Sequence, residues 1–97
     1  MSTHTAIAYH IVFSTKSRKQ FLNDEQVQGV TKYIGGILGN HKGCLLLGNG
    51  MQDHIHLLCS LHPDSSISEI ARVIKANSSR WIHENCPNLK TFEWHFR

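Results

Sequence analysis

Near the centre of this 97-residue chain lies the stretch Gln52-Asp53-His54-Ile55-His56-Leu57-Leu58-Cys59-Ser60, which predicts a β-strand with two unlike faces. Side chains alternate between the two faces of a strand, so Ile55 and Leu57 share an apolar face suited to a core. His54 and His56 share the opposite face, roughly 6 to 7 Å apart along the strand. Neutral imidazole is a good ligand for divalent transition metals. The stretch therefore predicts either half of a metal site or an exposed pair of histidines.

The chain before this stretch predicts a strand, a helix and a second strand. In Thr5–Ser14 the large residues Ile7, Tyr9, Ile11 and Phe13 occupy every second position, which is typical of a strand. Asn23 begins a capping box, and apolar residues then follow at helical spacing as far as Gly39-Asn40. Residues 44–47 form a short apolar run, which predicts a strand, and Gly48-Asn49-Gly50 predicts a turn or a bulge before the histidine strand.

The chain after this stretch predicts a second helix and a last strand. Ser66 and Glu69 form another capping box, and the helix that they open should run to about Glu84. Aromatic residues alternate in residues 91–96, which predicts a final short strand. The order strand, helix, strand, strand, helix, strand (βαββαβ) is that of the ferredoxin-like fold. We therefore expect an α+β protein with one antiparallel sheet and two helices on one face of it.

Length and composition set further limits. A chain of 97 residues predicts a single domain over residues 1–97. The formal charge of +3, with eight histidines counted as neutral, is a mild basic bias that permits a polyanionic partner without requiring one. The sequence contains no apolar run of membrane-spanning length and no signal-peptide pattern at its start. Its three cysteines form no CxxC pair, which fits a protein of the reducing cytoplasm.

Four segments of the chain resemble one known family, and they occur in that family's order. They are residues 9–16 followed by Arg18, residues 51–58, residues 66–80 and Phe92-Glu93-Trp94. The family is that of the single-tyrosine HUH transposases of the insertion-sequence-200-like class, which includes relatives associated with repetitive extragenic palindromes (REP). Residues 51–58 resemble the family's metal-binding strand, in which two histidines flank one bulky apolar residue.

The resemblance implies a DNA strand transferase that acts on single-stranded DNA. In such enzymes a tyrosine hydroxyl attacks a phosphodiester and becomes joined to the 5′ phosphate. His54 and His56, with a third polar ligand, would hold a divalent cation, Mg²⁺ or Mn²⁺, that polarises and orients the phosphate. The resemblance also implies a homodimer that recognises DNA hairpins.

The sequence departs from this family at the nucleophile. The family's tyrosine lies on a helix after the Phe-x-Trp strand, whereas this sequence ends at Arg97. Its only tyrosines, Tyr9 and Tyr33, match no position of the family's nucleophile. We therefore expect a C-terminally truncated domain that binds metal and DNA, has no catalytic tyrosine of its own and is inactive in cleavage by itself.

Basic side chains near the predicted strand and helix ends are candidates for phosphate contacts. The alternative is an ordinary solvated surface. The candidates are Lys16, Arg18 and Lys19 in the loop after the first strand, and Arg72, Lys75 and Arg80 on the second helix. Lys and Arg would bind the DNA backbone electrostatically, with strong salt dependence and without base specificity.

Several other residues near the histidines have two interpretations. His10 could approach the metal site from the neighbouring strand, but a hydrogen-bonded histidine on the sheet is the simpler expectation. Asp53 is expected as a turn residue or as a partner of a metal ligand rather than as a ligand. Trp81 and Trp94 could stack on bases, but Trp81 is expected in the core and Trp94 in packing or in a dimer contact.

Two other functions remain possible interpretations of the pattern. The first is a small ferredoxin-like RNA-binding module, which would carry exposed aromatic residues on its central strands; the histidines at those positions argue against it. The second is a hydrolase of the histidine-triad kind, but Leu58 stands where the third alternating histidine would be.

Overall fold

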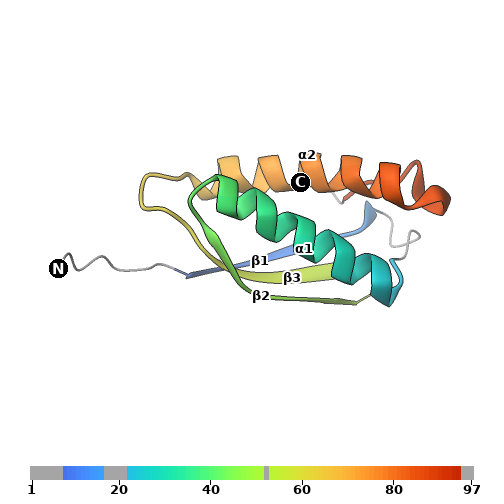
Figure 1. Ribbon diagram of the computed structural model, residues 1–97, viewed down its shortest axis with the longest axis horizontal. Coiled ribbons are helices and arrows are strands. Elements are labelled where there is room, and N and C mark those ends of the chain that lie inside the picture. Colours follow the sequence, from blue (N-terminus) through green and yellow to red (C-terminus); the bar gives the residue numbers. More distant parts are fainter. Residues whose placement is uncertain (1–7, 17–21, 52, 95–97) are drawn as a thin grey trace.

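The structure is a computed structural model that describes residues 8–16, 22–51 and 53–94. The elements follow one another in the order β1 (Ala8–Ser14), α1 (Asp24–Asn40), β2 (Cys44–Met51), β3 (His54–Ser60), α2 (Ile67–Asn85) and the short 3₁₀ helix η2 (Pro87–Leu89). The three strands form one antiparallel sheet in the order β1-β3-β2, and both helices cover the same face of it (Figure 1). The expected α+β class and ferredoxin-like arrangement are confirmed. Among the described residues, neither helix is long and apolar enough to cross a lipid bilayer.

Local capping signals set where both helices begin. At the start of α1 the Asn23 side chain accepts a hydrogen bond from the Gln26 amide at 2.8 Å, and the Gln26 side chain accepts one from the Asn23 amide at 3.0 Å. This is the expected reciprocal capping box. At the start of α2, Ser66 Oγ accepts a bond from the Glu69 amide at 3.4 Å, while the Glu69 carboxylate pairs with Arg72. Both predicted helices are therefore present, with ends within a residue of those expected.

The register of the sheet separates two faces. The inner face, toward the helices, carries buried side chains such as Phe13, Ile55 and Leu57. We call the opposite, uncovered face the outer face; it carries His10, Val12 and Ser14 from β1, His54, His56 and Leu58 from β3, and Leu47, Asn49 and Met51 from β2. In the sheet His56 lies between Val12 and Asn49, and His54 lies between Ser14 and Met51. The two histidines thus occupy the middle strand of an open face.

The prediction of a turn at Gly48-Asn49-Gly50 was wrong. β2 continues through these residues to Met51, and the bulge lies earlier, between Leu45 and Leu47. A Cβ atom on Gly48 would come within 2.3 Å of Thr31 Cγ2 on α1, and one on Gly50 within 3.0 Å of Val27 Cγ1. These glycines therefore allow α1 to lie close against β2, a role that a sequence pattern does not distinguish from a turn.

The expected fourth strand, over residues 91–96, is represented in the described part of the chain by a single bridge. Trp94 pairs antiparallel with Thr15, and the Lys16 amide donates to the Glu93 carbonyl at 2.9 Å. This places the segment beside the edge of β1, as the ferredoxin-like fold requires. Residues 95 and 96, and residues 5–7 of the expected first strand, lie outside the described residues.

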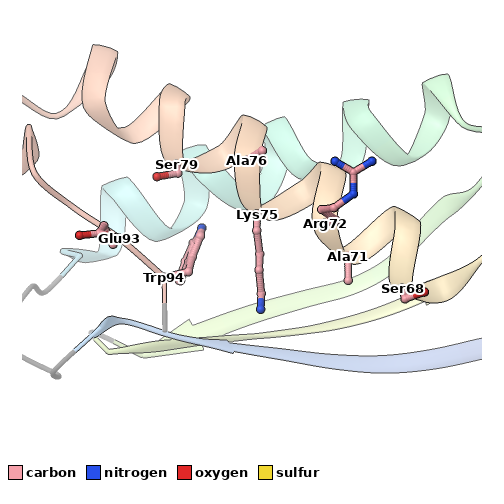
Figure 2. Close-up of a pocket in the computed structure, with 8 residues that line it drawn as sticks. All are labelled: Ser68, Ala71, Arg72, Lys75, Ala76, Ser79, Glu93 and Trp94. Carbon is pink, nitrogen blue, oxygen red and sulfur yellow. The ribbon is translucent and has the colours of Figure 1, made fainter. Parts of the chain in front are cut away.

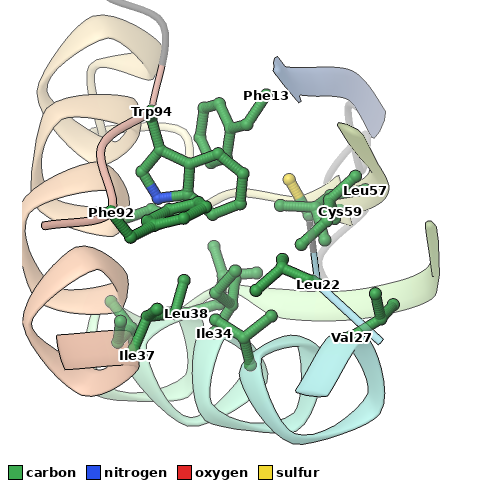
Figure 3. Close-up of a cluster of buried hydrophobic side chains, with 14 of the residues drawn as sticks. Phe13, Leu22, Val27, Ile34, Ile37, Leu38, Leu57, Cys59, Phe92 and Trp94 are labelled. Atoms are coloured by element: carbon green, nitrogen blue, oxygen red, sulfur yellow. The ribbon is translucent and has the colours of Figure 1, made fainter. Parts of the chain in front are cut away.

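One hydrophobic core fills the space between the helices and the inner face (Figure 3). Phe13, Phe92 and Trp94 form its aromatic end, with ring centroids 5.7 Å apart for Phe13–Trp94 and 4.9 Å apart for Phe92–Trp94. The indole Nε1 of Trp94 donates to the hydroxyl of Ser78, which is fully buried on α2. Trp94 is therefore a packing residue, as one of the two expectations for it had it.

Candidate metal and nucleic-acid site

His54 and His56 lie side by side on the outer face of β3. Their ring centroids are 4.8 Å apart, the rings meet edge to face at 72°, and both residues are half-buried. Because β3 is the central strand and is bonded on both sides, its backbone holds the two side chains at a fixed spacing. The sequence prediction of two neighbouring imidazoles on one face is confirmed, whereas their role as ligands stays a prediction.

Each of these histidines has its Nδ1 atom engaged by a neighbour. His54 Nδ1 lies 2.8 Å from Asp53 Oδ1, and His56 Nδ1 lies 3.0 Å from Nε2 of His10. The His10 and His56 rings also stack, with centroids 5.1 Å apart and planes inclined by 24°. A histidine whose Nδ1 carries the proton of such a bond offers the lone pair of Nε2 to a metal. Asp53 and His10 thus lie where residues that orient metal ligands are expected.

A small pocket opens beside His54 on the outer face. It has a volume of about 280 Å³ and is lined by Val12, Ser14, Asp53 and His54. Around it the outer face exposes apolar side chains: Val12 is 47% exposed, Leu47 64% and Met51 67%. Exposed apolar side chains grouped around a polar site are typical of a surface that contacts another molecule. The sequence analysis missed this apolar surround because the register of β2 was not known.

The two histidines stay the candidates for a metal site. In the part of the chain that the structure describes, no group of three or more His, Cys, Asp or Glu side chains is placed to hold an ion. Two imidazoles could supply at most two of the ligands of a cation, and water or a substrate oxygen would have to fill the other positions. Two nitrogen donors are more typical of a transition-metal site than of a Mg²⁺ site, since Mg²⁺ prefers oxygen ligands.

Neither tyrosine of the chain lies on the outer face. Tyr9 packs against the core, and its register partner on β3 is the buried Cys59. Tyr33 lies on α1, on the other side of the sheet, where its ring stacks on Trp81 with centroids 5.9 Å apart. The sheet itself therefore separates Tyr33 from the histidines, and the expectation that Tyr9 lies on the core side of its strand is confirmed.

Two of the predicted phosphate-binding residues line a groove along α2, which we call the α2 groove (Figure 2). The groove has a volume of about 550 Å³ and is lined by Ser68, Ala71, Arg72, Lys75, Ala76, Ser79, Glu93 and Trp94. Lys75 extends from α2 toward the sheet, and its Nζ lies 5.5 Å from the centroid of the Phe13 ring. Arg72 points away from the sheet and pairs with Glu69.

Of the remaining basic candidates the structure describes Lys16 and Arg80, and neither of them lines this groove. Lys16 pairs with Glu93, a groove residue, at 3.5 Å, and both side chains are exposed. Arg80 donates to the Asn77 side chain at 2.8 Å and does not line the groove. Arg18 and Lys19 lie outside the described residues. The structure thus brings Arg72 and Lys75 to one groove, and Lys16 pairs with Glu93 of that groove. The groove lies on the helix side of β1, whereas the histidines lie on the outer face.

Comparisons with known proteins agree with this geometry. The model of the family "Transposase IS200 like" matches residues 3–96. The chain is 28% identical over 88 residues to the ISDra2 transposase TnpA of Deinococcus radiodurans, covering 91% of this chain and 63% of that protein. It is 30% identical over 82 residues to the transposase for insertion sequence element IS200 of Salmonella typhimurium, covering 84% of this chain and 54% of that protein.

Solved structures agree as well. A candidate transposase from Deinococcus radiodurans R1 superposes with a TM-score of 0.84 at 27% identity, over 94% of this chain and 70% of that one. A REP-associated tyrosine transposase, solved bound to a REP hairpin, superposes with a TM-score of 0.67 at 18% identity, over all of this chain and 58% of that one, and so shares the fold. The chain belongs to the IS200-like transposase family. It spans between about half and two thirds of the length of these curated relatives.

Proposed function

We propose that this chain is a DNA-binding domain of a transposase that binds hairpin-bearing single-stranded DNA and holds a divalent cation at His54 and His56. The observation that carries the proposal is the arrangement of these two imidazoles, whose Nδ1 atoms are both engaged at 2.8 and 3.0 Å by neighbouring side chains. This leaves Nε2 of each ring as the ligand atom. Membership of the transposase family supplies the chemical context.

The cation would act on a DNA phosphate. His54 and His56 would hold it, Asp53 and His10 would orient those two rings, and the pocket beside His54 offers room for a phosphate oxygen. When bound, a divalent cation supplies Lewis-acid polarisation of a phosphoryl oxygen and orients the scissile bond. In this proposal the chain's own residues bind and orient the substrate, and the nucleophile is neither Tyr9 nor Tyr33.

The metal site is tested by titrating the protein with Mn²⁺ and Mg²⁺ in a calorimeter. We expect Mn²⁺ to bind with a stoichiometry of one and His56→Ala to abolish binding, because one imidazole alone cannot hold the ion. His62→Ala is the matched control, since His62 lies beyond the end of β3 and contacts Asp64 instead. Absence of Mn²⁺ binding by the wild-type protein would contradict the site, as would equal losses in both variants.

The basic residues of the α2 groove would contact DNA phosphates. The REP-associated transposase that shares this fold was solved with a REP hairpin, which supports a hairpin as the ligand. Arg72 and Lys75 line the groove, and Lys16 pairs with the groove residue Glu93. Phosphate contacts by such basic residues release condensed counterions. We propose that Arg18, Lys19 and Arg80 add to this backbone contact.

Binding of a fluorescent DNA hairpin, measured against an unstructured strand of equal length, tests the DNA partner. We expect the hairpin to bind more tightly, and Lys75→Ala to weaken binding and to reduce the slope of log K against log salt by about 0.7 to 0.9. Lys32→Ala removes the same charge from an exposed position of α1 outside the groove and serves as control. Equal affinity for both DNAs, or equal effects of both variants, would leave only non-specific electrostatics.

Two further readouts complete the proposal. We expect no covalent protein–DNA adduct from this chain alone, because both tyrosines lie away from the outer face; an adduct mapped to Tyr9 or Tyr33 would contradict this.

We also expect a homodimer, in line with the apolar side chains exposed around the histidines. Light scattering coupled to size-exclusion chromatography measures it, and a monomer at all concentrations would remove this part of the proposal. A transposase of this kind would act on DNA in the cytoplasm.

A further inference from the structure

We propose that His10 is a positioning residue for His56: its Nε2 accepts a hydrogen bond from His56 Nδ1–H and thereby keeps His56 Nε2 available as a ligand for a divalent cation. The inference rests on the proposed metal site and adds a residue to it that lies 46 positions away in the sequence. Its basis is the contact between the two rings, which joins an edge strand to the central strand.

The sheet register explains how the two rings meet. Val12 lies directly opposite His56, and His10 lies opposite Leu58, so His10 is the diagonal neighbour of His56 on the outer face. Diagonal neighbours on antiparallel strands lie roughly 7–8 Å apart, which is within reach of aromatic side chains. Here His10 Nε2 lies 3.0 Å from His56 Nδ1, and the two rings stack with centroids 5.1 Å apart. His10 is exposed, so these contacts with His56, rather than core packing, hold its ring.

The chemistry of a bond between two imidazoles allows only two proton arrangements when both rings are neutral. In one, His56 Nδ1–H donates to His10 Nε2, and the Nε2 atom of His56 carries a lone pair. In the other, His10 Nε2–H donates to His56 Nδ1, and His56 must carry its proton on Nε2, where a metal would bind. Only the first arrangement is competent to bind the ion, so a bound cation selects it.

Asp53 would position His54 in the same way, by accepting a hydrogen bond from its Nδ1–H. An ionised carboxylate can only accept, so the 2.8 Å contact between Asp53 Oδ1 and His54 Nδ1 requires a proton on that nitrogen. The two candidate ligands thus have matched partners, a carboxylate for His54 and an imidazole for His56. Loss of such an outer partner typically weakens metal affinity 10–100-fold.

Two substitutions of His10 separate the hydrogen bond from the stacking. His10→Phe keeps a flat ring over His56 but has no nitrogen, whereas His10→Gln offers an amide oxygen as an acceptor in place of Nε2. We expect His10→Phe to weaken Mn²⁺ binding by roughly 10–100-fold and His10→Gln to stay close to wild type. Thermal unfolding of both variants checks that this exposed position leaves the fold intact.

A second measurement reads the proton positions without any metal. Imidazole ¹⁵N chemical shifts of the metal-free protein, recorded at a pH where histidine is neutral, report which nitrogen of His56 carries the proton. We expect the Nδ1–H form of His56 in the wild-type protein to be more populated than in His10→Phe, and His10→Gln to restore it. An unchanged tautomer of His56 in His10→Phe would overturn the inference.

The outcomes distinguish this inference from the proposed metal site. No Mn²⁺ binding by the wild-type protein overturns both. Wild-type Mn²⁺ affinity in His10→Phe overturns the role of His10 alone. Equal losses in His10→Phe and His10→Gln also overturn it, because an acceptor at position 10 would then make no difference to Mn²⁺ binding.

Discussion

Replacing Ser78 by alanine tests the contact that fixes Trp94 beside the α2 groove. The Ser78 hydroxyl is fully buried, accepts a hydrogen bond from Trp94 Nε1 at 3.0 Å and donates to the Ile74 carbonyl at 2.5 Å. Trp94 is itself only 5% exposed. In Ser78→Ala the indole N–H, which can only donate, loses its acceptor in a buried environment.

The expected destabilisation follows from these contacts. A buried donor left without a partner costs about 1–3 kcal/mol, and alanine recovers roughly 0.5 kcal/mol as the better helix former. The net loss in the free energy of unfolding is therefore about 0.5–2.5 kcal/mol. For a domain of this size each kcal/mol lowers Tm by roughly 4–8 °C.

Urea unfolding followed by far-UV circular dichroism measures this loss, and a double-mutant cycle identifies its cause. A Trp94→Phe background has no indole N–H that could lose its acceptor, so Ser78→Ala should lower the free energy of unfolding much less there. Ser79→Ala is the neighbouring control, since the Ser79 hydroxyl lies at the limit of hydrogen bonding, 3.5 Å from the Phe92 carbonyl. An equal cost of Ser78→Ala in both backgrounds would refute the reasoning.

Two other predictions concern stability. Gly29→Ala should destabilise the protein although alanine is the better helix former, because its Cβ would meet the Trp81 ring at 2.7 Å. Gly36→Ala has open space around it and should stabilise the protein by up to about 1 kcal/mol. Urea unfolding of both variants measures the two changes, and a change of the same sign in both would contradict the prediction. Burial raises the pKa of the Cys59 and Cys86 thiols, so the folded state keeps these protons to higher pH than the unfolded chain, in which thiols titrate near roughly 8.5. The free energy that these two thiols add to folding should be fully present below that pH and be lost as pH rises through their raised pKa values. Urea unfolding over this pH range should show a shallower decline in the free energy of unfolding for Cys59→Ala than for the wild-type protein. A free energy of unfolding that rises over this range would refute the prediction.

Local patterns predicted much of the fold because their physics acts within a few residues. The capping box at Asn23 involves atoms three residues apart, and the start of α1 followed from it. Alternation along β3 likewise depends only on neighbouring residues, so the unlike faces at Ile55 and His56 could be predicted. The role of the glycines in β2 could not be predicted in this way. Gly48 is needed because Thr31 of α1 lies too close for a Cβ atom at that position, and this contact joins two different elements.

In the candidate site, too, some features could be predicted from local patterns and others depend on contacts between elements. The sequence indicated the pair His54 and His56 and six basic residues, but no spacing could predict which of these meet. The groove with Arg72 and Lys75 lies on the helix side of β1, and the histidines lie on the other side of the sheet. This separation implies that one DNA strand would have to pass the edge of β1 to contact both.

The sequence by itself determined that two imidazoles share one face of a strand, since backbone geometry makes every second side chain point the same way. It also determined where each helix begins. Only the tertiary structure decided that His10 engages His56, because this contact depends on the register of two strands that are distant in sequence. Register is set by packing of the whole inner face against the helices, and no local run of residues contains that information.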